Sequence, residues 1–194
     1  MLSRHESIFD ALLPVALAVE NNRMGARLVL MRELRNDPNF DLVAHRSPHH
    51  FVARGGDDPQ AEIDRIGRLA EQLPHDTAVV IYPEGRLSRP HVRRRIIDRL
   101  EGADPVAASR ARELEHLLPI RPGGVAALLD RAPEGTHVAF VAHVGYRRLT
   151  DPRTIWRSIP LRDPIEVEVF REPVLAVPPT CLLYTSPSPR DIGE

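Results

Sequence analysis

The stretch that decides the fold is Ala78-Val79-Val80-Ile81-Tyr82-Pro83-Glu84-Gly85-Arg86-Leu87-Ser88-Arg89. Its first five residues are apolar and include three β-branched side chains in a row, which predicts a strand buried on both faces. Pro83 ends this strand because proline cannot donate to a sheet ladder. A carboxylate, a glycine and a guanidinium group therefore follow the exit of a buried strand, which is where ligands bind in open α/β sheets.

The residues before this strand predict a strand–helix–strand unit. Phe51–Arg54 has a short strand pattern, and Asp57-Asp58-Pro59 predicts a helix start with an aspartate cap and proline in the first turn. That helix has one apolar face, made by Ile63, Ile66, Leu69, Ala70 and Leu73. The order strand, helix, strand implies parallel strands joined by a right-handed crossover. We therefore expect an α/β fold with a mostly parallel central sheet flanked by helices.

Further elements are predicted on both sides of this unit. Strands are expected at Leu28–Met31, at His137–Val144 and at Ile165–Phe170, whose alternation of apolar and acidic residues is typical of a half-exposed edge strand. Helices are expected at about 92–100 and 106–118, and again after a sharp loop at Pro119–Gly124.

The composition is ordinary for a soluble globular domain: 194 residues, 42% hydrophobic, 27% charged and a formal net charge of -1. A net charge this small creates no global attraction to nucleic acid or to a membrane. Cys181 is the single cysteine, so no internal disulfide is possible. Ala11–Val19 is too short to span a bilayer, and we predict neither a signal peptide nor a transmembrane helix. Residues 181–194 break the composition and the periodicity, and we expect a domain at 1–180 and a non-native-looking unstructured tail at 181–194.

The first candidate site follows the buried strand. Gly85 allows a ligand to approach the backbone closely, Glu84 can orient a neighbouring cation, and Arg86 can bind a phosphate through a forked hydrogen bond. The alternative is an ordinary turn with solvated charges. Arg54 is a second candidate phosphate ligand, because it ends a strand just before two glycines. It could equally be a surface charge.

The second candidate site is at the start of the chain, where His5 and Asp10 are five residues apart. They can meet only if His5 lies in the turn before a helix that contains Asp10. The sequence permits this helix, since an apolar stripe at helical spacing follows, formed by Ile8, Phe9, Leu12, Leu13, Ala16 and Leu17. A carboxylate on one imidazole nitrogen leaves the other nitrogen as a base. The alternative is a solvent-exposed histidine and an unrelated aspartate in a first helical turn. We expect no metal site, because His49-His50 has no further ligand at a suitable spacing.

Together these motifs resemble the glycerolipid acyltransferases, the family that includes lysophosphatidic acid and lysocardiolipin-type acyltransferases. His5 and Asp10 match its first motif, and Phe51, Val52 and Arg54 match its second, although Pro48 stands where a glycine is usual. The third motif, Phe-Pro-Glu-Gly-Thr-Arg-Ser, is Tyr82-Pro83-Glu84-Gly85-Arg86-Leu87-Ser88 here. The family's arginine position is thus Leu87, and Arg86 is a candidate substitute. The resemblance covers about residues 4–173, and the family's strand and helices before the first motif are expected to be missing.

The resemblance implies a glycerol-3-phosphate acyltransferase-like fold and transfer of a fatty acyl group in phospholipid biosynthesis or remodelling. The donor would be acyl-CoA or acyl carrier protein, and the acceptor a hydroxyl of a lysophospholipid or glycerol phosphate. His5 and Asp10 would be catalytic, and Arg54, Glu84, Gly85 and Arg86 would bind the acceptor, with no metal or redox cofactor. We expect the protein to act at the cytoplasmic face of a membrane and to have no nucleic-acid partner. Two alternatives stay open: a catalytically silent lipid-binding relative, and a nucleic-acid-binding module that uses the arginines of residues 86–95.

Overall fold

The computed structural model describes residues 1–36, 38, 48–53, 58–114, 116–146, 149, 151–161 and 164–177. The strands are β1 (Leu2–Ser3), β2 (Gly25–Met31), β3 (His50–Val52), β4 (Thr77–Val80), β5 (His137–Val144) and β6 (Glu166–Pro173). The helices are η1 (Asp10–Leu12), α1 (Leu13–Ala16), η2 (Leu17–Asn21), η3 (Arg32–Asn36), α3 (Pro59–Arg68), α4 (Pro90–Ala103), α5 (Pro105–Glu113), α6 (Pro122–Asp130), α7 (Pro152–Arg157) and η5 (Val174–Ala176). The expected tail at 181–194 and its boundary at 180 lie outside the described residues.

The strands form two three-stranded sheets, ordered β3-β2-β4 and β1-β5-β6. All pairs are parallel except β5 with β6, which is antiparallel. An isolated parallel bridge between Leu2 and Ile81 joins the two sheets, so β4 lies beside β1. This arrangement confirms the α/β class and the mostly parallel sheet. The apolar run predicted as one strand ends earlier than expected, since Ile81 forms only the bridge and Tyr82 lies beyond it.

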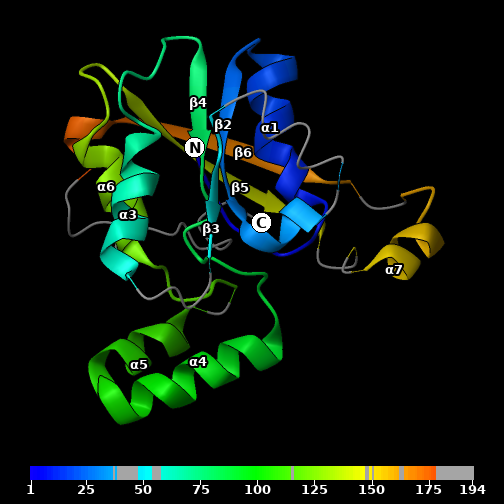
Figure 1. Ribbon diagram of the computed structural model, residues 1–194. Helices are drawn as coiled ribbons and strands as arrows, with labels where there is room; N and C mark the ends of the chain where they lie inside the picture. The colour runs from blue at the N-terminus through cyan, green and yellow to red at the C-terminus, as the bar shows by residue number, and fades with distance from the viewer. Residues whose placement is uncertain are drawn as a thin grey trace.

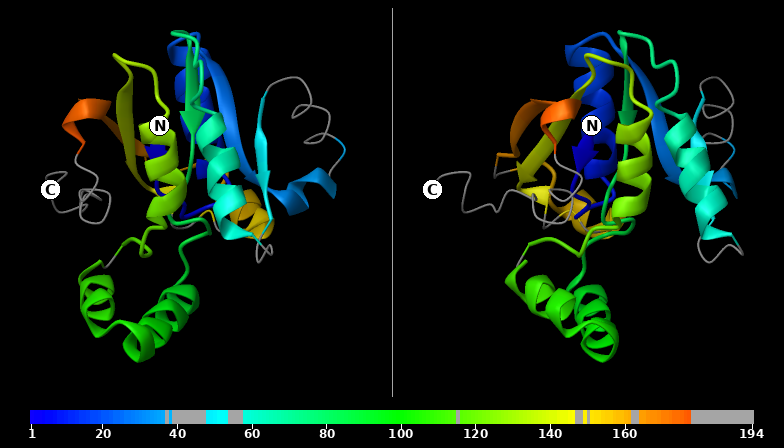
Figure 2. Two further views of the ribbon diagram at one scale, coloured as in Figure 1. Left: turned by 60° about the vertical axis from the view of Figure 1, so that its left-hand side comes forward. Right: turned by 90° about the vertical axis from the view of Figure 1, so that its left-hand side faces the viewer.

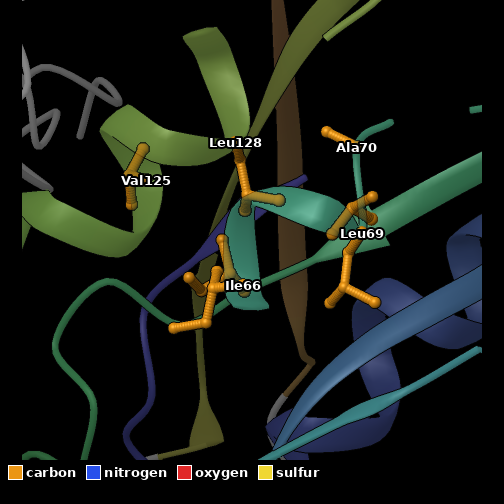
Figure 3. Packing of buried hydrophobic residues seen from close by; sticks show 7 residues of the cluster. Ile66, Leu69, Ala70, Val125 and Leu128 are labelled. Atoms are coloured by element: carbon orange, nitrogen blue, oxygen red, sulfur yellow. The ribbon is translucent and has the colours of Figure 1, made fainter. Parts of the chain in front are cut away.

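Helices α3 and α6 lie side by side on one face of the sheet, while α1 and η2 lie on the other (Figures 1 and 2). The main buried cluster joins α3 and α6 to strand β4, and Figure 3 shows its packing around Ile66, Leu69, Ala70, Val125 and Leu128. Helices α4 and α5 form a hairpin that projects away from the sheet (Figure 1). The chain thus forms a layered body with one helical hairpin outside it.

Helix α6 begins earlier than the sequence predicted. Residues 119–124 were expected as a loop, but α6 begins at Pro122 and includes both glycines. The reason is close packing. A Cβ atom on Gly124 would lie 3.2 Å from Ile66 Cδ1, and one on Gly67 would lie 2.9 Å from the backbone oxygen of Ala127. The glycines therefore allow the two helix backbones to approach each other.

The helical segment after His5 leaves part of its apolar stripe exposed. Ile8, Phe9 and Leu12 are 51%, 42% and 59% exposed. The side chains that face inward are spaced four residues apart, and Asp10 is the first of them, followed by Pro14 and Ala18. The other members of the stripe, Leu13, Ala16 and Leu17, are partly buried, and Asp10 is held inside the protein by polar partners described below.

Candidate active site

His5 and Asp10 meet at the carboxyl end of strand β1. The chain leaves β1 after Ser3, His5 lies in the following turn, and Asp10 begins helix η1. His5 Nδ1 is 2.6 Å from Asp10 Oδ1. The side chain of Asp10 is fully buried, whereas that of His5 is 19% exposed. Because the Asp10 carboxylate accepts a hydrogen bond from His5 Nδ1, the neutral imidazole carries its proton on Nδ1 and has a lone pair at Nε2. The structure therefore shows the arrangement that the sequence permits, with His5 in the turn before the helix that contains Asp10.

The turn between the two residues holds the carboxylate in place. Asp10 Oδ2 accepts hydrogen bonds from the backbone N–H groups of Glu6 at 2.5 Å and Ser7 at 2.6 Å. Ser7 is fully buried, and its hydroxyl donates to the backbone oxygen of Leu149 while accepting from the N–H of Phe9. Its proton is thus already engaged away from the His5 ring, so Ser7 is not arranged as a nucleophile.

Tyr82 packs against the imidazole of His5, a contact that no sequence pattern indicated. The two ring centroids are 4.6 Å apart at an angle of 36°. The Tyr82 hydroxyl donates to the backbone oxygens of Ala11 at 2.9 Å and Asp10 at 3.3 Å. Burial, helped by the charge of Asp10, raises the pKa of this hydroxyl well above its ordinary value, so it stays a donor. Tyr82 therefore connects the end of β4 to both sides of the His5–Asp10 pair.

Glu84 lies beneath the site, with its side chain almost entirely buried. Its Oε1 accepts from the N–H of His5 at 3.3 Å, and its Oε2 accepts from the N–H of Leu118 at 3.2 Å. Burial raises the pKa of Glu84 to about 7, against the opposing effect of these two hydrogen bonds. The N–H of Ser88 donates to the oxygen of His5 at 2.6 Å. The turn after β4 is thus fastened to the backbone of His5 from two sides.

Gly85 and Arg86 follow on the outside of this turn. Gly85 is exposed and has a positive φ of 64°, a conformation that favours glycine, and its N–H donates to the oxygen of Tyr82 at 2.9 Å. Arg86 is half-buried. Arg54, the other predicted phosphate ligand, lies outside the described residues. The structure therefore brings four of the six candidate residues, His5, Asp10, Glu84 and Gly85, to one end of the sheet, and Arg86 is next to Gly85 in the chain.

Another residue of the site that sequence reasoning missed is His143, near the end of β5. Its side chain is fully buried, and its Nε2 is 3.7 Å from Asp10 Oδ2. The signal that could have found it was a polar residue within the otherwise apolar run 138–144. Among the described residues, no group of three or more His, Cys, Asp or Glu side chains is arranged to hold a metal ion.

A buried carboxylate that orients a partly exposed imidazole defines a class of site in which histidine serves as a general base. In the comparison with family models, the model described as Acyltransferase matches residues 1–142. The chain belongs to this acyltransferase family. Searches of curated proteins and of solved structures gave no significant match.

Proposed function

We propose that this acyltransferase moves a fatty acyl group from an acyl thioester, acyl-CoA or acyl carrier protein, to a hydroxyl of a lysophospholipid or of glycerol phosphate. The observation that carries the proposal is the 2.6 Å contact between His5 Nδ1 and Asp10 Oδ1, with the imidazole partly exposed and the carboxylate buried. An alcohol is a poor nucleophile at neutral pH, so its attack on a thioester needs a base of this kind.

The proposed reaction needs no covalent enzyme intermediate. His5 Nε2 takes the proton of the acceptor hydroxyl as its oxygen attacks the thioester carbonyl carbon. The tetrahedral intermediate then expels the thiolate, which takes the proton back from the His5 imidazolium. Asp10 keeps the ring in the correct tautomer and stabilises the imidazolium charge. No metal or redox cofactor enters this scheme.

The acceptor's phosphate would bind at the turn after β4, where Gly85 is exposed. Gly85 offers close approach to the backbone, and Arg86 and Arg54 are the proposed cationic ligands. Glu84 contributes to this subsite by holding the turn, since its own oxygens face the N–H groups of His5 and Leu118. The substitution of Leu87 for the family's arginine supports the second candidate, a silent lipid-binding relative.

We further propose that the protein works at the cytoplasmic face of a membrane. The exposed apolar side chains of Ile8, Phe9 and Leu12, on the segment that carries Asp10, support contact with lipid. In the described part of the chain, no helix combines the length and the apolar character needed to cross a bilayer. The nucleic-acid alternative has less support, because Arg93 of the basic run donates to the backbone oxygens of Ala111, Arg112 and Leu114.

The test is an acyl transfer assay with labelled acyl-CoA or acyl carrier protein, with and without lysophosphatidic acid or glycerol phosphate. His5→Ala should slow transfer by at least about 100-fold, the lower range for general-base catalysis. His137→Ala is the matched control, since His137 is exposed at the start of β5. Donor binding without transfer in the wild-type protein would instead support the silent relative. Near wild-type turnover in a folded His5→Ala protein would exclude His5 as the base.

A further inference from the structure

Strand β5 supplies a second histidine to the carboxylate of Asp10. His143 Nε2 is 3.3 Å from the backbone oxygen of Arg4 and 3.7 Å from Asp10 Oδ2. Both of these atoms are hydrogen-bond acceptors, so Nε2 must carry a hydrogen. Burial lowers the pKa of His143, although the charge of Asp10 opposes this shift, and burial thus favours the neutral ring.

The other ring nitrogen, Nδ1, takes part in no hydrogen bond within the described part of the chain, although it is buried. The ring meets Tyr146 edge to face, with centroids 5.0 Å apart. A buried nitrogen without a partner costs free energy, and an apolar side chain would fill this position without that cost. Packing alone therefore does not account for an imidazole here, whereas the donor at Nε2 does.

We propose that His143 is a positioning residue that holds the Asp10 carboxylate, and through it His5, in the reactive arrangement. This inference rests on the proposed general-base role of His5. The family match ends at residue 142, so His143 lies just beyond it.

The geometry explains what this donor adds. The hydrogen bonds to Asp10 come from its own turn, from the backbone of Glu6 and Ser7 and from His5. The His143 Nε2–H group donates from the sheet to the oxygen of Arg4, the residue before His5, and it lies 3.7 Å from Asp10 Oδ2, where it attracts the carboxylate electrostatically without a hydrogen bond. One N–H group thus connects both ends of the catalytic turn to a rigid strand. The charged groups that act on His143 are Arg4, Glu6 and Asp10.

Three substitutions separate the donor from the volume of the ring. His143→Phe keeps a ring and removes the donor. His143→Gln can place an N–H donor near the position of Nε2, whereas the shorter side chain of His143→Asn cannot. We expect kcat to fall about tenfold in the Phe and Asn variants, as for the loss of one hydrogen bond that positions the site, and to recover in the Gln variant. The KM values for donor and acceptor should not change.

A second readout does not depend on activity. In the wild-type protein the proton on His5 Nδ1, bonded to a carboxylate, should give a far-downfield NMR signal, assigned by its absence in His5→Gln. This signal should persist in His143→Gln and broaden or vanish in His143→Phe and His143→Asn, because the carboxylate is held less firmly.

The two readouts distinguish the ways in which the inference can fail. An unchanged kcat and an unchanged Nδ1 proton in a folded His143→Phe protein would overturn the inference. A folded His143→Gln protein whose kcat is as low as that of His143→Asn would also overturn the inference. If the Phe variant does not fold, the comparison of the Gln and Asn variants provides the test. If the wild-type protein transfers no acyl group, the proposed function fails, and the NMR comparison still tests the role of His143.

Discussion

At the scale of single residues, the site is a set of backbone and side-chain hydrogen bonds around one buried carboxylate. Asp10 accepts from His5 through one oxygen and from the N–H groups of Glu6 and Ser7 through the other. Charge-assisted hydrogen bonds of this type are stronger than those between neutral groups. The position of the imidazole therefore depends on the charge and the geometry of this one side chain.

Replacing Asp10 by asparagine tests that dependence. If the amide oxygen keeps the two backbone N–H groups, the amide NH₂ faces His5 Nδ1 and favours the tautomer with its hydrogen on Nε2. The base is then lost, and the imidazolium loses its counter-charge. We expect kcat to fall at least about 100-fold, with a smaller effect on stability. Steady-state kinetics and urea unfolding measure the two effects, and an Asp10→Asn rate within a few-fold of wild type would contradict the role.

Glu84 predicts a pH dependence of stability. Its pKa is raised from 4.5 to about 7 in the folded protein, mainly by burial. The folded state therefore holds a proton that the unfolded state loses between these two values, and stability should fall as pH rises through this window. The Gln side chain does not titrate, so the stability of Glu84→Gln relative to wild type should rise between pH 5 and pH 8.

Urea unfolding of both proteins at intervals of pH measures this difference. The shift corresponds to a change on the order of 3 kcal/mol across the window. A stability difference that does not vary with pH would show that Glu84 has the same pKa in the folded and unfolded chains.

At the scale of elements, close contact between α3 and α6 sets the packing above strand β4. Gly67 faces the backbone of Ala127, and the cluster of Ile66, Val125 and Leu128 lies at the same interface. Backbone atoms cannot move aside as the end of a flexible side chain can. The separation of the two helices is therefore fixed by the absence of a side chain at this position.

Gly67→Ala should destabilise the protein by about 1–3 kcal/mol, because the new Cβ would lie 2.9 Å from the backbone oxygen of Ala127. Gly102→Ala in α4 is the matched control, since a Cβ atom added there would meet nothing within 4 Å. Alanine favours a helix over glycine, so the control should be neutral or stabilised by up to about 1 kcal/mol. Thermal unfolding of both variants measures the difference, and equal stabilities would contradict the packing argument.

At the scale of the whole molecule, the site lies at the carboxyl end of parallel strands, beside exposed apolar side chains. The turn that holds His5 follows β1, the turn that holds Glu84 follows β4, and β1 lies next to β4. Ile8, Phe9 and Leu12 project from the same segment as Asp10. The proposed chemistry and the proposed lipid contact thus share one short part of the chain.

The double variant Phe9→Ser/Leu12→Ser should bind lipid vesicles about tenfold or more weakly than wild type. Insertion of each apolar side chain into lipid is worth on the order of 1.5–3 kcal/mol, so even partial insertion gives an effect of this size. Val106→Ser in α5 is the control, because Val106 is 59% exposed, as is Leu12, and lies in the projecting hairpin. Co-sedimentation with anionic vesicles measures the binding, and equal binding by all three proteins would contradict the proposed contact.

From the sequence alone one can predict the α/β class, most strands and helices, and the one arrangement in which His5 can meet Asp10. These features depend on patterns within a few residues, such as the apolar run at 78–82 and the proline at the start of α3. The tertiary structure alone decided the neighbours of the site. His143 is 139 residues from Arg4 in the chain, and Glu84 is 79 from His5. Local periodicity carries no information on contacts at such separations. Nor does an apolar pattern indicate that Asp10 is buried, because Asp10 is held inside by polar partners.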